Sequence, residues 1–283
     1  MSKLKLSELD ILESQAKLAE LPQGKLLINT INAHSFNTAQ KDSLFSEALK
    51  KGDVLIPDGA SIVKACKWIG AKSQPKERIA GWDLFSFEME KLERMQNAEC
   101  RMQNRRKAAE GKANYSQKEN NAQPNSASCI LNSALKRRVM FMGSSQKVLD
   151  LIVKKAAEVY PHLEIVTYSP PYKPEFSDED NAAIIKAIND ADPDLLWIGM
   201  TAPKQEKWTY SHWSELNIHC HVGTVGAVFD FFAGTYQRAP QWWQDHSLEW
   251  LYRLIKEPKR MWRRYVLGNP LFLYNIAKER FSR

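Results

Sequence analysis

Six short apolar runs, separated by amphipathic helical patterns, constrain the fold of this chain more than any other feature. Each run reads as a buried strand that ends in small or polar residues. The runs cover residues 25–33, 53–59, 137–145, 163–169, 194–200 and 218–232. Apolar strands that alternate with helices favour a parallel sheet covered on both faces. We therefore expect an α/β fold, a Rossmann-like parallel-sheet sandwich.

The predicted strands also suggest how the chain is organised. They end at residue 232, so we expect a Rossmann-like core over residues 1–246 and a helical appendage over 247–283. The chain has 283 residues, 43% of them apolar, which is enough for a folded core. Its four cysteines form no C-x-x-C pair, which excludes a disulfide scaffold and a zinc-finger array. An acidic N-terminus and the lack of an 18-residue apolar run predict a cytoplasmic protein without a spanning helix.

The net charge of +7 is concentrated in two segments, so the rest of the chain is mildly acidic. Residues 91–138 carry a net +7, and residues 95–137 are rich in Asn, Gln, Lys, Arg, Ser and Ala. We predict that 95–137 is a basic insertion without a packed core, because it has little apolar surface to bury. A solvated loop is the simpler interpretation, and an arm that touches a membrane or partner is the alternative.

The second basic segment, residues 249–283, carries a net +6 and interleaves aromatic side chains with arginines. Trp250 and Trp262, for example, stand near Arg253 and Arg263. Such amphipathic helices suit a lipid headgroup interface, where aromatic rings lie at the boundary and cations meet phosphates. The alternative is a helical pair docked on the core with its basic face in water.

Polar residues follow the predicted strands, where α/β folds of this kind place ligands. They are Thr30, Asn32, His34 and Asn37 after the first run, Asp58 after the second, Gly143, Ser144 and Ser145 after the third, and Gly199 to Glu206 after the fifth. No P-loop and no G-x-G-x-x-G motif is present, which disfavours kinases and dehydrogenases. Together these residues predict a nucleotide cleft, in which Lys204 and Gln205 could hold a diphosphate and a uracil or sugar edge.

Asp58 is the best candidate for a general base. A carboxylate at a tight turn after a strand can be aimed at a substrate hydroxyl. Its alternative role is a helix N-cap, which Asp also favours. Asp83 and Asp230 are weaker candidates by the same logic.

No metal site is predicted. His219 and His221 flank Cys220 in a strand, so the cysteine points away from both histidines, and structural roles are the simpler interpretation. The alternating acids from Asp190 to Asp194 imitate a metal-binding D-x-D motif. They precede a strand rather than follow it, which indicates a surface turn on the opposite side from the cleft.

Several linked motifs make the chain similar to the WecG/TagA/CpsF glycosyltransferases, glycosyltransferase family 26. They are Thr-x-Asn-Ala (30–33), Pro-Asp-Gly (57–59), Glu-Arg-Ile-Ala-Gly-Trp-Asp (77–83), Ala-Pro-Lys-Gln-Glu-Lys-Trp (202–208), Val-Gly-Ala-Val-Phe-Asp-Phe-Phe-Ala-Gly (225–234), Arg-Ala-Pro (238–240) and Leu-Glu-Trp-Leu-Tyr-Arg-Leu-Ile-Lys-Glu-Pro (248–258). The resemblance runs from about residue 26 to 264, the insertion excepted.

The resemblance implies an inverting, UDP-sugar-dependent hexosyltransferase. It would move N-acetylmannosamine, its uronic acid or glucose from a UDP-sugar to a polyprenyl-diphosphate-linked saccharide during bacterial cell-surface polysaccharide or teichoic acid assembly. The protein would act as a peripheral protein on the inner face of the cell membrane, bound through its C-terminal segment. No cofactor and no metal are expected, and self-association stays open.

The resemblance also implies roles for individual residues. Asp58 corresponds to the family's proposed base and Thr30 to its donor-contacting threonine. The residues assigned to donor binding are Asn32, Gly143, Ser144, Gly199, Pro203, Lys204, Gln205, Gly226 and Asp230. The arginines assigned to the acceptor diphosphate are Arg238, Arg253, Arg260 and Arg263.

Two other classes of function are open to test. A nucleic-acid-binding α/β protein would use both basic segments and bind in a strongly salt-dependent way. A catalytically silent membrane adaptor would keep only the C-terminal appendage. The acidic core disfavours nucleic acid as a partner, and the intact Thr30, Asp58 and Gln205 disfavour the adaptor.

Overall fold

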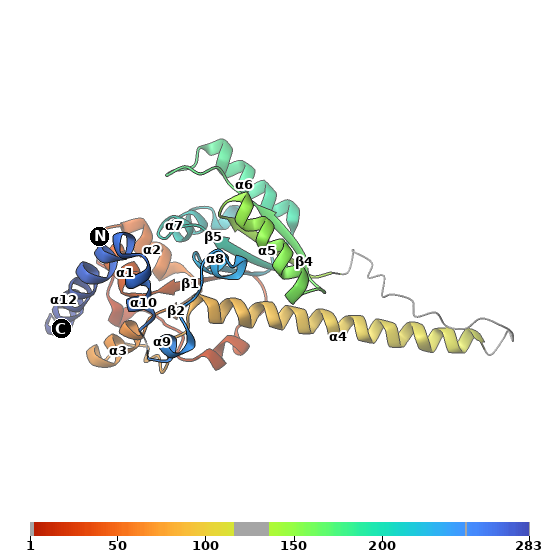
Figure 1. Ribbon diagram of the computed structural model, residues 1–283, viewed down its shortest axis with the longest axis horizontal. Helices are drawn as coiled ribbons and strands as arrows, with labels where there is room; N and C mark the ends of the chain where they lie inside the picture. The colour runs from red at the N-terminus through yellow and green to blue at the C-terminus, as the bar shows by residue number, and fades with distance from the viewer. Residues whose placement is uncertain (1–2, 116–135, 247, 283) are drawn as a thin grey trace.

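The computed structural model describes residues 3–115, 136–246 and 248–282, and it has a six-stranded parallel sheet at its centre (Figure 1). The strands are β1 (Leu26–Ile31), β2 (Val54–Pro57), β3 (Arg138–Gly143), β4 (Glu164–Tyr168), β5 (Leu195–Gly199) and β6 (His221–Thr224). Their order in the sheet is β2-β1-β6-β5-β3-β4, and every neighbouring pair is parallel. Each of the six predicted runs contains a strand, and the predicted Rossmann-like α/β fold is confirmed. The sixth run was predicted as a strand over 218–232, which is wrong for its second half, because β6 ends at Thr224 and α8 begins at Val228. Val228, Phe229 and Phe232 are buried at helical spacing.

Helices occupy the connections between the strands and continue after the last one. The α-helices are α1 (Ala33–Ala39), α2 (Ser43–Lys51), α3 (Ala60–Ile69), α4 (Gly81–Tyr115), α5 (Gln146–Val159), α6 (Asp178–Ala191), α7 (Lys204–Ser211), α8 (Val228–Ala233), α9 (Gln241–Asp245), α10 (Glu249–Lys256), α11 (Pro258–Trp262) and α12 (Gly268–Phe281). The described part of the chain also contains the short 3₁₀ helices η1 (Leu6–Glu8), η2 (Gln15–Glu20) and η4 (Trp213–Glu215). A π-helical turn, η5 (Arg263–Leu267), joins α11 to α12.

The sheet is buried on both faces because successive strand residues point in opposite directions. Val139 and Phe141 of β3 pack with residues of α4, α5 and α8 on one face. Met140 and Met142 pack with α6 and α7 on the other face. A third apolar cluster covers the β1–β2 side and joins α1, α2, α3 and the N-terminal segment to α12.

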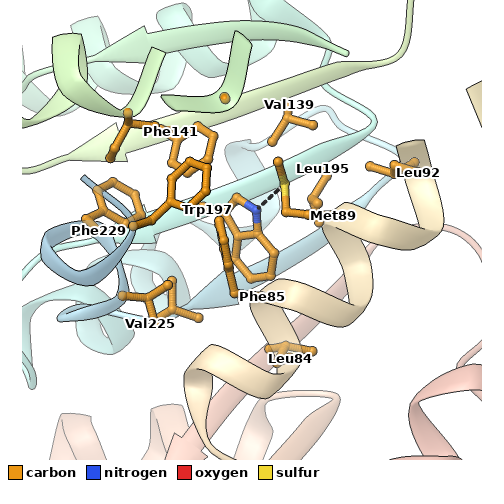
Figure 2. Packing of buried hydrophobic residues seen from close by; sticks show 14 of the residues in the cluster. Leu84, Phe85, Met89, Leu92, Val139, Phe141, Leu195, Trp197, Val225 and Phe229 are labelled. Atoms are coloured by element: carbon orange, nitrogen blue, oxygen red, sulfur yellow. Dashed lines mark hydrogen bonds between the residues drawn. The ribbon is translucent and has the colours of Figure 1, made fainter. Parts of the chain in front are cut away.

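Trp197 of β5 fills the centre of the first face and explains a glycine in the neighbouring strand. Its indole N–H donates to the sulfur of Met89 in α4 at 3.4 Å (Figure 2). A Cβ atom on Gly223 of β6 would lie 2.2 Å from the Trp197 ring. Glycine at 223 therefore leaves the space that the largest buried side chain of the sheet occupies.

The structure differs from the prediction at the start of the basic insertion. Residues 95–115 continue α4, which extends well beyond the sheet in Figure 1, and residues 116–135 lie outside the described residues. Leu84, Met89 and Leu92 dock the first half of α4 in the core. Once a helix is nucleated in this way, a run rich in Ala, Arg, Lys, Glu and Gln propagates it readily.

The C-terminal segment is a helical appendage, as predicted, and α12 docks on α1 and α3. Phe272 and Ile276 are buried against Phe36 and the N-terminal leucines. The Glu279 carboxylate accepts hydrogen bonds from the backbone N–H groups of Leu6 at 3.0 Å and Ser7 at 2.8 Å. Within the described ranges, no helix is both long and apolar enough to cross a membrane.

Candidate functional site

The carboxyl ends of four adjacent strands form the edge at which the candidate site lies. In the order β2, β1, β6 and β5, these strands lead into Asp58, Asn32, Gly226 and Met200. Parallel strands all end at the same edge, so residues far apart in the sequence are brought together there. The predicted connections after β1 and β2 are therefore neighbours in space, as are those after β3 and β5, and the turn after β6 lies between the two pairs.

Asp58 is held by the backbone of two strands. Its N–H donates to the carbonyl oxygens of Ile31 at 2.9 Å and Ile56 at 3.1 Å. The N-cap of α3 is Gly59, whose predecessor Asp58 makes no capping hydrogen bond to the helix. The alternative role of Asp58 as an N-cap is therefore wrong. Its half-buried carboxylate is not used to cap the helix and can interact with a substrate.

Burial raises the pKa of Asp58 above its ordinary value, because the charged form loses hydration. The nearby positive charges of Arg78, Arg253 and Arg264 oppose this rise in the pKa, and Glu249 adds to it. A carboxylate whose pKa is raised is a stronger proton acceptor than one with the ordinary pKa. The electrostatics thus suit a general base.

Glu249 of α10 ties the appendage to the core beside Asp58. Its carboxylate accepts from Arg78, in the segment before α4, at 3.1 Å and from Arg253 of its own helix at 3.0 Å. Arg253 also lies over the ring of Phe231, 5.0 Å from its centroid. One carboxylate shared by two arginines leaves a net positive charge around Asp58.

Arg264 lies in the π-helical turn η5, within electrostatic reach of Asp58. It acts electrostatically on both Asp58 and His34. Its Nε is buried and has no hydrogen-bond partner among the described residues. The neighbouring Arg263 is exposed. A buried guanidinium nitrogen without a partner is ready to bind an anion.

His34, in the first turn of α1, faces this arginine as a neutral imidazole. Burial, followed by the positive charge of Arg264, lowers the pKa of His34 to about 4. Its backbone N–H donates to Oδ1 of Asn32. His34 therefore adds hydrogen-bonding capacity near Asp58 without adding charge at neutral pH.

Two predicted donor residues at the end of β1 have local structural roles as well. Asn32 caps α1, and its Oδ1 accepts from the N–H groups of His34 and Ser35 at 3.0 Å. Thr30 is half-buried and faces the start of α4, where a Cβ on Gly81 would lie 3.9 Å from its methyl group. Both residues lie at the same edge as Asp58.

The glycines that end β3 and β5 are explained by close packing. Gly143 and Gly199 are partners in register. A Cβ on Gly143, which has φ +118°, would lie 2.4 Å from the carbonyl oxygen of Gly199. A Cβ on Gly199 would lie 2.5 Å from the ring of Phe229. Ser144 follows with φ +60°, so the turn after β3 is narrow and bent.

Gln205 and Glu206, in the first turn of α7, are buried beneath the turn after β5. The Gln205 side chain accepts from the N–H of Met200 and donates to Glu206. Pro203, the N-cap of α7, follows a cis peptide bond. The Gln205 side chain thus holds the carboxyl end of β5 through Met200, and its amide is buried rather than free at the surface.

Lys204 and Asp230 were also predicted to bind the donor substrate, and each makes a hydrogen bond within the protein. The Lys204 ammonium donates to the carbonyl oxygen of Lys173 at 2.5 Å and lies 3.4 Å from the Phe176 ring centroid. It therefore contacts the β4–α6 connection. Asp230 accepts from the hydroxyl of Thr235 at 3.2 Å.

The four arginines predicted to bind the acceptor diphosphate differ in where they lie. Arg238 lies 3.8 Å from Asp83 and within electrostatic reach of Asp58, so it joins Arg253 at the cluster. Arg263 is exposed. Arg260 belongs to α11, and its side chain lies outside the described part of the structure.

Residue-by-residue reasoning placed His34 among the residues of the cleft but did not assign Arg78, Glu249 or Arg264 to the site. Arg78 lies within the Glu-Arg-Ile-Ala-Gly-Trp-Asp motif that supports the resemblance, so the motif itself was the available signal. Arg264 has no such signal, because only the π-helical turn distinguishes its direction from that of Arg263.

The residues considered as metal ligands have structural partners. Both ring nitrogens of buried His221 face acceptors, Glu88 at 3.1 Å and the carbonyl oxygen of Pro22 at 2.9 Å. Asp194 accepts from the N–H of Arg138 at the amino end of the sheet, which agrees with a surface turn. Across residues 3–115, 136–246 and 248–282, no group of three His, Cys, Asp or Glu side chains is arranged to hold a metal ion.

A parallel-sheet α/β domain with a carboxylate among arginines at its strand ends is typical of enzymes that act on anionic, nucleotide-type substrates. The sequence pattern described as the glycosyl transferase WecG/TagA/CpsF family matches residues 2–102 and 112–283. The chain belongs to this family. The residues between the two matched parts lie in α4.

Two curated relatives cover most of the chain. Both are named N-acetylglucosaminyldiphosphoundecaprenol N-acetyl-beta-D-mannosaminyltransferase. The relative from Bacillus subtilis (strain 168) is 27% identical over 253 residues, which are 89% of this chain and 79% of the relative. The relative from Bacillus spizizenii is 26% identical over 273 residues, which are 96% of this chain and 87% of the relative.

Proposed function

We propose that this glycosyltransferase transfers N-acetylmannosamine from a UDP-sugar to a polyprenyl-diphosphate-linked N-acetylglucosamine, with inversion at the anomeric carbon. The observation that carries the proposal is the half-buried Asp58 carboxylate, whose pKa is raised, among Arg78, Arg253 and Arg264. The names of the two Bacillus relatives support the sugar and the acceptor. A role in cell-surface polymer assembly follows from such an acceptor.

In the proposed reaction Asp58 takes the proton from the acceptor hydroxyl. The acceptor oxygen then forms a bond to the anomeric carbon, on the face opposite the nucleotide. The bond between that carbon and the UDP oxygen breaks, and its electron pair leaves with UDP. A carboxylate with a raised pKa contributes to this step because it competes better for the hydroxyl proton.

Positive groups around Asp58 would stabilise the two diphosphates. Arg238, Arg253 and Arg264 surround the carboxylate, and Glu249 neutralises only part of their charge. Charge that develops on the leaving UDP is offset most effectively by such fixed groups. Because arginines can supply this compensation, we expect transfer to continue in the presence of EDTA.

We propose that the appendage also brings the protein to the inner face of the cell membrane, where the lipid-linked acceptor lies. Large apolar side chains on it are exposed, among them Ile255, Trp262, Leu267 and Leu273. Exposed basic residues, Lys256, Lys259 and Arg263, lie between them. This combination of exposed apolar and basic groups is typical of interfacial helices.

The test is sugar transfer from a panel of UDP-sugars to a short-chain prenyl-diphosphate-N-acetylglucosamine, with EDTA present. We expect transfer from UDP-N-acetylmannosamine, and a loss of about 10²–10⁴-fold in kcat for Asp58→Asn. Asp190→Asn removes a surface carboxylate that pairs with Lys186, and its rate should equal that of the wild type. Near-normal turnover by Asp58→Asn would disprove the assignment of the base, and no transfer from any donor would disprove the proposed reaction.

A further inference from the structure

Glu206 in the first turn of α7 is a buried carboxyl group that the proposed reaction does not use. Its residue is 2% exposed. Oε1 accepts a hydrogen bond from Nε2 of Gln205 at 2.9 Å, whereas Oε2 is buried without a partner among the described residues. A buried carboxyl group with one unsatisfied oxygen costs stability. We therefore expect the Glu206 carboxyl group to have a function that offsets this cost in stability.

The hydrogen bond from Gln205 has only one consistent orientation. Oε1 of Gln205 accepts from the backbone N–H of Met200 at 3.1 Å. A backbone N–H can only donate, so the amide oxygen must face Met200 and the amide nitrogen must face Glu206. The N–H of Met200 sets the orientation of the Gln205 amide, and Glu206 holds the amide nitrogen in that orientation.

The Gln205 amide lies between the turns that follow β5 and β6. Gly226, in the turn after β6, has φ +44°. A Cβ on Gly226 would lie 3.4 Å from Oε1 of Gln205 and 3.3 Å from the carbonyl oxygen of Met200. The two turns meet over this amide, so its position sets their separation.

We propose that Glu206 is a positioning residue of the nucleotide-sugar cleft, which acts through Gln205 to hold the turns after β5 and β6 in register. The inference rests on the proposed function, because it takes the donor cleft to lie at these strand ends. Burial raises the pKa of Glu206 to about 7. The group can hold Gln205 whether or not it is protonated, since Oε1 remains an acceptor in both forms.

A purely structural role predicts a different response to substitution. Methionine has nearly the shape of glutamate and buries no charge, so Glu206→Met should keep or increase the stability of the fold. If Glu206 only fills space, ligand binding should also be unchanged. If it positions Gln205, ligand binding should weaken although the fold is intact.

The experiment measures UDP binding to the full chain by isothermal titration calorimetry and the melting temperature by calorimetry. We expect Glu206→Met to weaken UDP binding by roughly tenfold with an unchanged or higher Tm. A tenfold change is the size expected when the hydrogen bond that positions Gln205 is lost. Glu206→Gln should bind UDP within about threefold of the wild type, because its amide oxygen can accept the same bond.

Thr209→Val is the matched control. Thr209 is buried in the same helix and donates to the backbone carbonyl of Gln205, but it does not contact the Gln205 amide. Its UDP affinity should equal that of the wild type.

Wild-type affinity in Glu206→Met, or equal losses in Glu206→Met and Glu206→Gln, would overturn the inference. A Glu206→Met protein that failed to fold would also overturn it, because the carboxyl group would then be a requirement of the fold. Wild-type protein that binds no UDP would instead overturn the proposed donor, and with it the basis of the inference.

Discussion

At the scale of single residues, the surroundings decide which of several similar side chains can do chemistry. Asp58 and Asp83 were both candidates for the general base; Asp58 follows strand β2, and Asp83 lies in the first turn of α4. Asp83 accepts from the N–H of Ala80 at the start of α4, which is a capping role. Asp58 has no capping role, and burial raises its pKa. Identical functional groups thus differ in role because their hydrogen bonds and hydration differ.

The two adjacent arginines of the π-helical turn provide a residue-level prediction. Arg264→Ala should raise the KM for the prenyl-diphosphate acceptor by about 10–100-fold, because it removes a partly buried, charge-assisted phosphate contact. Arg263→Ala is the matched control, and we expect its KM to change by less than about threefold, because Arg263 is exposed. Steady-state kinetics with the acceptor varied measures both values. A larger effect for Arg263 than for Arg264 would reverse the assignment.

Glu206 provides a prediction about stability and pH. Its pKa is raised from 4.5 to about 7 by burial, so between these values the folded state keeps a proton that the unfolded state has lost. This group's contribution to stability is therefore present below pH 4.5 and is lost as the pH rises past 7. Relative to Glu206→Gln, the wild type should lose up to about 3 kcal/mol across this window. Urea unfolding of both proteins at pH 5 and pH 8 measures the difference, and parallel pH profiles would contradict it.

At the scale of elements, the appendage is held to the core near both of its ends. Glu249 joins α10 to Arg78 at one end. At the other end Asn37 of α1 donates to the carbonyl oxygen of Gly268 at 2.7 Å, and α12 packs on the core. The intervening turn η5 carries Arg264. The direction of Arg264 therefore depends on how α12, which begins directly after this turn, docks on the core.

Phe272 should be the main anchor of α12. Its ring is 2% exposed and meets Phe36 edge to face, with 5.5 Å between the ring centroids. Phe272→Ala removes a buried ring and should cost about 3–5 kcal/mol. We expect hydrogen exchange to show lost protection in residues 249–281, while β3 and β5 keep theirs. Leu273→Ala, at a neighbouring position that is 63% exposed, is the control and should leave exchange unchanged.

At the scale of the whole molecule, charge and apolar surface are unevenly distributed. The two basic segments lie on different elements, since 91–115 belongs to α4 and 249–282 to the appendage. Figure 1 shows α4 extending away from the sheet and α12 at the far side of the molecule. The appendage combines its charge with several exposed large apolar side chains, and its Arg253 and Arg264 lie within electrostatic reach of Asp58.

Membrane binding by the appendage is therefore a prediction for the whole protein. The protein should sediment with vesicles that contain anionic lipid, and less of it should sediment as salt increases. The double variant Ile255→Ser, Trp262→Ser should reduce the bound fraction severalfold, because both side chains are exposed and apolar. Val153→Ser, an exposed apolar position on α5, is the control. Equal vesicle binding by the double variant and the wild type would show that the appendage does not bind the membrane through these side chains.

The sequence was sufficient for the strands and for the residues that follow them, but not for every element. Each strand is a short apolar run, and this local signal does not depend on the rest of the chain. The helix over 95–115 was missed because its composition resembles that of a polar loop. It forms because α4 is already nucleated by Leu84, Met89 and Leu92, which are buried in the core.

The runs that contain the strands and the position of Asp58 at a strand end could be predicted from the sequence, because period and composition are local properties. The strand order, the network of Arg78, Glu249 and Arg253, and the burial of Arg264 could not be predicted in this way. These features depend on how elements distant in the sequence pack together. A one-residue change in helical register exchanges buried and exposed side chains, and no local pattern records that choice.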